Sequence, residues 1–334
     1  MLHRLSSILR NHNSSSGWPW LRRSNPQWVT VTVLVLIVVT VFTPGCSVKR
    51  LAINKLGDAL SGGGTTFASD DDPELIKSAV PFSLKLMESL LQESPRHQGL
   101  LLASASGFTQ FAFAFVQQEA DELEDQDVLL AKTMRDRARK LYLRARDYGF
   151  RGLQLEHPNF VVNLRANPSV TLSRCHPKQT AFLYWTAASW AAAIAVSKDD
   201  PNLVADLNLV EAMMDRAFAL DPSWNEGAIH SFFISYELVR QSGPGSGTDR
   251  ARSHFEKAVA LSSGKSASPY VSYAESVCVQ EENRAGFEKA LNAALQVDVN
   301  AIPGNRLVNT VMQRRARWLL NRIDKLFLPP VPPS

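Results

Sequence analysis

The histidines are the first residues to examine for chemistry, and their spacing argues against an enzyme. The chain has no HExxH pair and no i, i+4 pair of metal-ligating histidines. It also has no GxSxG nucleophile motif and no glycine-rich phosphate loop, since residues 242–247 are typical of a linker between helices. We interpret five histidines as structural or surface residues: His97, His157, His176, His230 and His254. The sequence therefore predicts no enzymatic activity, no cofactor and no metal site.

The cysteines and an acidic run are the other residue types that could carry chemistry. Cys175 and Cys278 are far apart in the chain, so a disulfide in an oxidising compartment and two buried thiols both stay open. The acidic residues 70–72 lack the spaced ligands and the closing glutamate of an EF-hand calcium loop. Asp72 before Pro73 and Glu74 instead predicts the start of a helix.

Two groups of aromatic residues could line a binding site. The first lies in a segment otherwise made of small residues and consists of Tyr184, Trp185 and Trp190; the second consists of Phe232, Phe233 and Tyr236. Rings in such segments can line an apolar ligand channel. Aromatic residues at helical spacing also pack in ordinary cores, and the sequence does not separate these two interpretations.

A basic group near the C-terminus could bind a partner. Arg314, Arg315 and Arg317 lie beside Trp318, which is a combination typical of protein interfaces and of sites for anionic lipid head groups. The alternative is the solvated outer face of a helix that closes the domain.

The elements that would position these residues begin after a leader. Residues 28–42 form an uncharged apolar run of about 22 Å as a helix, which is the length of a signal-peptide core. Thr43, Pro44 and Gly45 precede Cys46 and resemble the lipobox of bacterial lipoproteins. We expect residues 1–45 to be a signal peptide, Cys46 to be acylated and residues 46–68 to be a tether and linker. An uncleaved signal anchor is the alternative.

Charge counting removes one class of partner. The chain has 36 basic and 32 acidic residues, and the leader holds four of the arginines and no acidic residue. The remainder has 36 − 4 = 32 basic residues against 32 acidic ones. A body without net charge has no general attraction for phosphate backbones, so we expect no nucleic-acid binding.

The body, residues 69–328, is predicted to be all-α. Helical stripes of apolar residues occur at 209–220, 250–261 and 287–294, with earlier helices at 100–116, 132–148 and 184–194. Ala217, Ala258 and Ala294 occupy equivalent places at intervals of 41 and 36 residues, which is typical of a TPR-like α-solenoid. We expect about four helix–turn–helix repeats with extra helices at both ends. Residues 314–328 are the predicted closing helix, and residues 329–334 a proline-rich tail.

Several phrases carry a more specific resemblance. They are ASDDDPEL (68–75), LYWTAASWAA (183–192), WNEGAIH (224–230), SSGKSASPY (262–270) and RRARWLL (314–320). In order and over nearly the whole body, they resemble the TRAP transporter TatT component family. The resemblance implies a periplasmic lipoprotein that forms homo-oligomers, with a trimer expected. It also implies an apolar channel, a hydrophobic organic acid as ligand, and association with the TRAP substrate-binding protein.

From these observations we expect a membrane-tethered accessory subunit of a TRAP transporter. It would dock the substrate-binding protein and hold an apolar ligand, on the periplasmic side of a bacterial envelope. Ser47 after Cys46 favours the outer membrane. The alternative is an envelope adaptor of the TPR type that binds no small molecule.

Overall fold

The structure is a computed structural model, and it describes residues 27, 30–31, 46–62 and 64–327. The chain divides into two compact units, residues 1–49 and residues 50–334. The predicted leader, apart from residues 27, 30 and 31, and the predicted tail lie outside the described residues. The fold is therefore that of the second unit.

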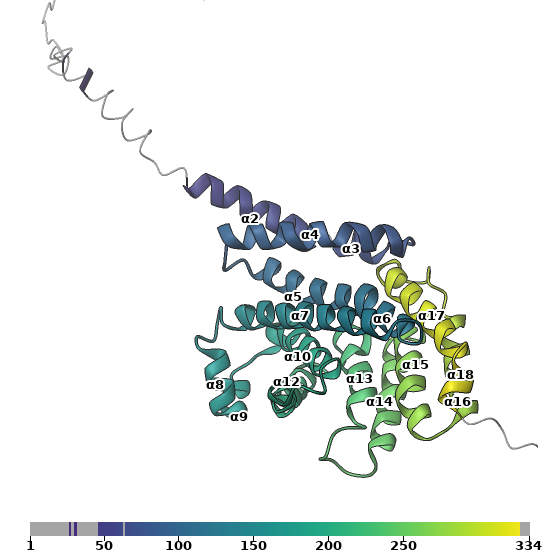
Figure 1. The fold of residues 1–334 in the computed structure, drawn as a ribbon. Helices are drawn as coiled ribbons and strands as arrows, with labels where there is room; N and C mark the ends of the chain where they lie inside the picture. Colours follow the sequence, from purple (N-terminus) through teal and green to yellow (C-terminus); the bar gives the residue numbers. More distant parts are fainter. Residues whose placement is uncertain (1–26, 28–29, 32–45, 63, 328–334) are drawn as a thin grey trace, which may run out of the picture. The chain divides into compact units, whose positions relative to one another are not determined.

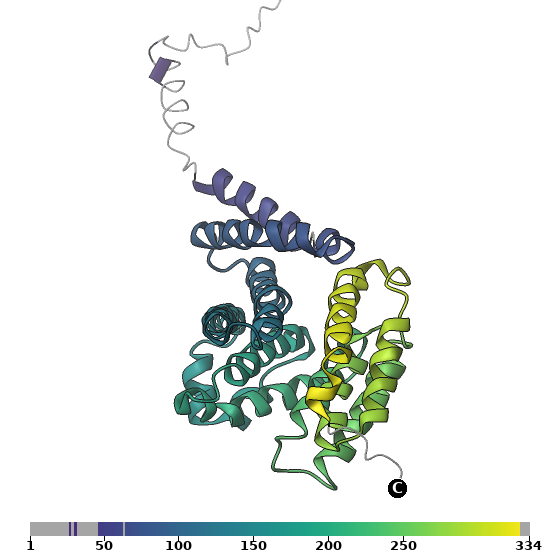
Figure 2. The same cartoon turned by 45° about the vertical axis from the view of Figure 1, so that its right-hand side comes forward.

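Every regular element in the described part of the chain is helical, which confirms the all-α part of the prediction (Figures 1 and 2). The first elements are α2 (Cys46–Gly62), α3 (Gly64–Ala68), α4 (Pro73–Glu93), α5 (Gln98–Ala112), the π-helical turn η1 (Phe113–Gln117), α6 (Gln118–Leu123) and α7 (Val128–Leu153). The middle elements are α8 (Phe160–Ala166), α9 (Pro168–Ser173), the 3₁₀ turn η2 (Pro177–Gln179), α10 (Thr180–Ala195), α11 (Pro201–Val204), α12 (Leu207–Leu220) and α13 (Trp224–Tyr236). The last are α14 (Gly247–Leu261), α15 (Ser268–Tyr273), the π-helical turn η3 (Ala274–Cys278), α16 (Arg284–Gln296), the 3₁₀ turn η4 (Pro303–Asn305), α17 (Arg306–Leu320) and α18 (Ile323–Leu326).

Polar side chains fix where several helices begin. The Asp72 carboxylate accepts hydrogen bonds from the amides of Glu74 and Leu75, both at 3.0 Å, so the predicted cap of α4 is confirmed. Asp127 and Asn283 cap α7 and α16 in the same way. Each cap satisfies amides that have no partner within the helix, which is why these helices begin where they do.

Two large apolar cores lie at different ends of the unit. The larger one joins α5, α7, α10, α12 and α13 around Trp190, and it includes Met213 and Met214. The other joins α15, α16 and α17 around Phe287 and Leu291. Neighbouring helices pack in pairs, α7 with α10 and α13 with α14 among them. The predicted helices at 209–220, 250–261 and 287–294 are confirmed as α12, α14 and α16.

The prediction of the closing helix was wrong at both ends of the helix. It begins at Arg306 rather than at residue 314, and α17 ends at Leu320 before the separate short helix α18. Its first half contains the polar residues Asn309 and Gln313, and both are buried. Asn309 bonds to the backbone of Lys265 and Ala267, and the Gln313 amide donates to the carbonyls that end α16.

Residues 46–68, expected as a tether and linker, contain the helices α2 and α3. Gly57 lets α2 approach α5 closely, since a Cβ there would lie 2.7 Å from Nε2 of His97. Ser94 donates a hydrogen bond of 2.7 Å to Oδ1 of Asn54, and Ile53 packs against the larger core. These contacts join residues about 40 positions apart, which is why the local sequence did not indicate them.

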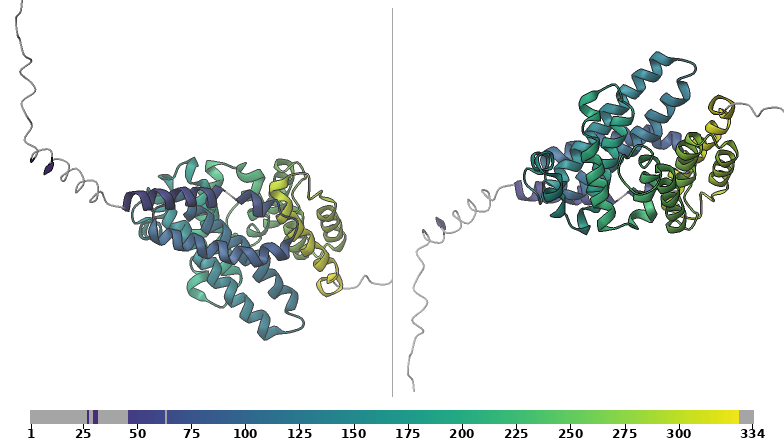
Figure 3. Two further views of the ribbon diagram at one scale, coloured as in Figure 1. Left: turned by 90° about the horizontal axis from the view of Figure 1, so that it is seen from above. Right: turned by 90° about the horizontal axis from the view of Figure 1, so that it is seen from below.

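The helical run Gln98–Leu123 is long and apolar enough to cross a membrane, and it is the one such helix among the residues described. More than half of it is buried inside the protein, where it contributes to the core around Trp190 and to a third core that contains Phe108, Phe115 and Tyr142. Its apolar residues therefore serve packing. Viewed from above and below, the paired end of α6 and start of α7 extend beyond the helices around them (Figure 3).

Replacing Gly152 by alanine should destabilise the protein. A Cβ at this position of α7 would overlap Cε1 of the Phe182 ring on α10, and both residues are buried. Overpacking of this kind costs about 1–3 kcal/mol. Urea unfolding checks the expected loss.

The matched control is Gly304→Ala, because nothing lies within 4 Å of a Cβ there. Equal stabilities of the Gly152 and Gly304 variants would show that α7 and α10 are not packed as described.

Candidate functional site

The six predicted aromatic residues separate into two groups. Trp190 and Phe233 are fully buried, and Tyr236 is nearly so. Trp190 packs edge-on against Phe150, with ring centroids 5.4 Å apart, and the Tyr236 hydroxyl donates to Glu211. These three residues belong to the core. Tyr184, Trp185 and Phe232 are half-buried, so they are the members of the predicted set that border on solvent.

Tyr184 is the centre of a half-buried aromatic group. Its ring lies 5.0 Å from Trp185 and 4.6 Å from Trp224, measured between centroids. Burial raises the pKa of Tyr184 to about 12 and is the one cause of that shift. No described residue forms a hydrogen bond with its hydroxyl. We call Tyr184, Trp185 and Trp224 the aromatic group.

Trp224 was missed as a site residue in the sequence, and an unusual backbone places it. Asn225, Glu226 and Gly227 follow it with φ values of 48°, 56° and 88°. Non-glycine residues in this region cost on the order of 1–3 kcal/mol each, and such strain is concentrated at ligand and switch sites. Glu226 accepts a hydrogen bond of 2.8 Å from Asn305, which helps to hold the turn. The signal in the sequence was Trp-Asn-Glu-Gly, since Asn and Gly favour positive φ.

The aromatic group combines an apolar surface with a single hydroxyl. Its rings offer a half-buried apolar surface, and the Tyr184 hydroxyl can donate one hydrogen bond to a polar atom beside it. Among the described residues, no three histidine, cysteine, aspartate or glutamate side chains are arranged so that they could hold a metal ion.

The predicted basic docking group is largely engaged within the chain. Arg315 is nearly buried and lies between two carboxylates, 2.9 Å from Asp121 and 2.6 Å from Glu275. Arg314 pairs with Glu122 at 2.6 Å. The Trp318 ring lies between the guanidinium groups of Arg315 and Arg322, at 4.6 and 4.5 Å. Arg317 is exposed.

These ion pairs line a small hollow of about 290 Å³ between the start and the end of the unit. Asp121 and Glu124 reach it from the first helices, and Glu275, Arg315 and Trp318 from the last. Here acidic residues of α6 contact basic residues of α17, although the two groups are more than 190 residues apart in the chain. Both groups of charged residues are visible in the sequence, but their contact is not.

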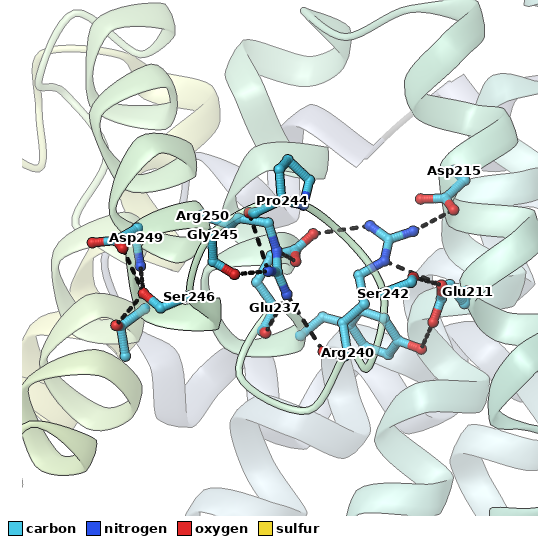
Figure 4. Close-up of polar contacts among 12 residues, drawn as sticks. Glu211, Asp215, Glu237, Arg240, Ser242, Pro244, Gly245, Ser246, Asp249 and Arg250 are labelled. Carbon is cyan, nitrogen blue, oxygen red and sulfur yellow. Dashed lines mark hydrogen bonds and ion pairs between the residues drawn. The ribbon is translucent and has the colours of Figure 1, made fainter.

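A second ion-pair cluster surrounds the buried Glu237 at the end of α13 (Figure 4). Its two oxygens accept from Arg240 at 2.9 Å and from Arg250 at 2.5 Å. Arg240 also donates to Glu211 and Asp215, and Arg250 donates to the carbonyls of the loop before α14. All charges in this cluster are paired, so we assign it to holding the 237–246 loop.

The buried His230 and the half-buried His254 form a pair, although they are 24 residues apart in the sequence. Their Nδ1 atoms are 2.8 Å apart, so one ring donates its N–H to the other. Burial lowers the pKa of both residues, for His230 to about 4. The pair is therefore neutral at pH 7 and structural, as the sequence indicated.

Cys175 and Cys278 are free and buried, which decides between the two alternatives. Burial raises the pKa of each thiol to about 11, so both are protonated and unreactive at neutral pH.

Comparison with known proteins gives the family. The family described as TRAP transporter T-component (TAtT) matches residues 69–327. The chain belongs to the TRAP transporter T-component family. It is 32% identical over 302 residues to an uncharacterised protein of Treponema pallidum (strain Nichols), a match that covers 85% of this chain and 94% of the relative. This T-component thus comes from a family of transporter accessory proteins of the bacterial envelope, and not from a family of enzymes.

Replacing Arg315 by alanine should strongly destabilise this T-component. Asp121 and Glu275 would lose their shared partner in a mostly buried place, and breaking a buried pair costs about 3–5 kcal/mol. Urea unfolding at pH 7 measures the loss. Arg317→Ala is the control on the same helix, since Arg317 is exposed. A loss below 1 kcal/mol for Arg315→Ala would contradict the described contact.

The histidine pair should make the T-component sensitive to acid. The unfolded chain binds protons near the ordinary histidine pKa of about 6.5, while the folded chain holds His230 neutral down to about pH 4. Stability from this residue is therefore complete above pH 6.5 and is lost as the pH falls toward 4. Urea unfolding from pH 7 to pH 4.5 should show a shallower decline in His230→Gln than in the wild type. The exposed His176→Gln is the control; if all three proteins decline alike, the pair has no such effect.

Proposed function

We propose that this T-component is the periplasmic accessory subunit of a TRAP transporter that docks the substrate-binding protein and holds an apolar ligand. The half-buried aromatic group, in a chain of this family, carries the proposal. We further propose that Cys46 is acylated and tethers the protein to the outer membrane, and that it assembles as a trimer. The lipobox-like residues before Cys46 and the family support these points.

The ligand class follows from the aromatic group. An apolar body would lie on the rings of Trp185 and Trp224, and a polar end would accept a hydrogen bond from Tyr184. A hydrophobic organic acid has both parts. Phe232 is half-buried too, and we propose that it extends the same lining.

The helices support a TPR-like repeat arrangement. We propose four units, α5 with α7, α10 with α12, α13 with α14, and α15 and η3 with α16. Each of these pairs is in contact, and α13 also contacts α15. The basic face of α17 with the exposed Arg317 is a proposed contact for a partner.

The second candidate function is an adaptor that binds no small molecule. One observation favours it: Trp190 and Phe233, two of the proposed lining residues, are part of a solid core. The two candidates differ in whether the aromatic group is ever occupied.

Native mass spectrometry of the chain from residue 47 on, with and without its substrate-binding protein, tests the proposal. We expect a trimer, a bound small molecule and a stoichiometric complex. A complex without any small molecule would favour the adaptor. A monomer that ignores the substrate-binding protein at micromolar concentration would contradict the proposed function as a whole.

Replacing Tyr184 by phenylalanine should weaken binding of an apolar acid. Decanoic acid is a suitable probe, followed by the fluorescence of Trp185 and Trp224. A hydrogen bond to a charged group contributes about 1.5–3 kcal/mol, so the dissociation constant should rise at least tenfold. The control is Tyr270→Phe, a half-buried tyrosine packed on Phe255 away from the group. Equal effects of the two changes would contradict the role of Tyr184.

A further inference from the structure

Helix α7 concentrates positive charge in a body that is neutral as a whole. Its 26 residues contain eight basic side chains and two acidic ones, Asp136 and Asp147, which gives 8 − 2 = +6. Residues 46–334 together have no net charge, since 32 basic and 32 acidic residues balance. The charge of α7 is therefore a local feature that the total hides.

Part of this charge lies in one row on the outer side of α7. Arg137, Lys140, Arg144 and Arg151 are spaced by three, four and seven residues, which places them on one helical face over about 21 Å. We call these four residues the α7 row. The first three are exposed, and Arg151 is half-buried.

The α7 row is poorly neutralised within the chain. Among the residues described, no carboxylate lies within ion-pair distance of Arg137 or Lys140. Arg144 is 3.6 Å from Glu88 and lies over the Phe108 ring, and Arg151 lies over the Tyr148 ring and donates to the Pro95 carbonyl at 3.4 Å, so neither has a close carboxylate. The arginines of α17 differ, because Arg314 and Arg315 each have carboxylates at 2.9 Å or less. The α7 row thus has charge left for another molecule.

A hollow of about 450 Å³ lies along the same face. It is lined by Lys140, Leu143, Arg144, Asp147, Tyr148 and Arg151. Tyr148 is held rigidly, since its ring stacks on Phe108 at 5.9 Å and its hydroxyl donates to Glu88 at 2.9 Å. The surface therefore combines the apolar side chains of Leu143 and Tyr148 with cations that are unpaired (Lys140) or only weakly paired (Arg144), a composition found in protein interfaces.

We propose that the α7 row and its hollow form the docking surface for an acidic face of the substrate-binding protein. Carboxylates of that partner would meet Arg137, Lys140 and Arg144, and one apolar side chain would enter the hollow beside Leu143 and Tyr148. The identity of the partner rests on the proposed function; the surface and its charge do not.

The same observations favour a protein over an anionic membrane. Asp147 lies within the surface but is paired with Arg146 at 2.8 Å, so the charge of the surface does not separate the two partners. Its shape does, because the hollow fits a side chain that projects from a folded surface, which a layer of head groups does not offer.

The experiment measures the affinity of the T-component, from residue 47 on, for its substrate-binding protein by calorimetry. The test variant is Lys140→Glu with Arg144→Glu. The matched control is Lys257→Glu with Lys289→Glu, which changes the net charge equally at exposed lysines of α14 and α16. We expect the dissociation constant to rise at least thirtyfold in the test variant and less than threefold in the control. Raising the salt concentration should weaken the wild type more than the test variant.

Three results would overturn this inference. Unchanged affinity in the test variant, with tight binding by the wild type, would leave the proposed function standing and place the docking surface elsewhere; Arg317→Glu then tests α17. Equal losses of affinity in the test and control variants would show that the effect comes from the net charge of the protein and not from this surface. Binding of the wild type to phosphatidylglycerol vesicles that the test variant loses, without a change toward the substrate-binding protein, would assign the surface to lipid.

A wild type that does not bind the substrate-binding protein at all would overturn the proposed function, and this docking surface with it. Unchanged melting temperatures of both variants are required in each case, and exposed substitutions of this kind normally leave stability within about 0.5 kcal/mol. Because Arg137 is not part of the test variant, Arg137→Ala gives an independent check and should weaken binding about three- to tenfold.

Discussion

Arg315 joins two parts of the T-component that have separate apolar cores. One core surrounds Trp190, and the other lies around Phe287 in the last helices. The guanidinium group contacts Asp121 of the first part and Glu275 of the second. Because it is nearly buried, each carboxylate interacts with it more strongly than exposed charges would. Around it, Arg314 and Arg322 add contacts to Glu122 and Asp125.

This polar contact between the two ends has consequences for how the protein behaves. Apolar packing also joins the two parts, since Ile234 of α13 and Ala251 of α14 form one cluster with Val277 of η3. The ion pairs of α17 respond to salt and pH more than this apolar packing does. The strained turn after Trp224 is tied to the same region, since Glu226 bonds to Asn305 just before α17. This bond ties the turn that follows Trp224 to the segment just before α17.

Sequence patterns gave the local features well and the long-range ones poorly. The cap at Asp72 and the helices α12, α14 and α16 could be predicted because each depends on residues within one or two helical turns. The start of α17 could not, because Asn309 and Gln313 are buried only through partners in other helices. Of the candidate site, Tyr184 and Trp185 were found from composition. Trp224 was missed, since its contact with Tyr184 depends on three consecutive positive φ values.

The two π-helical turns position the carboxylates that bind Arg315. The lengths of two segments that are far apart in the sequence are therefore constrained together. Glu275 lies within η3, and Asp121 follows η1 by four residues. A π-helical turn holds one residue more than a regular helix, and one residue corresponds to about 100° of rotation. Loss of a single codon in η1 would turn Asp121 and Glu122 away from α17, whereas a conservative substitution would not. Relatives that keep the Arg315 contact should therefore keep the length of both segments, even where their residues differ.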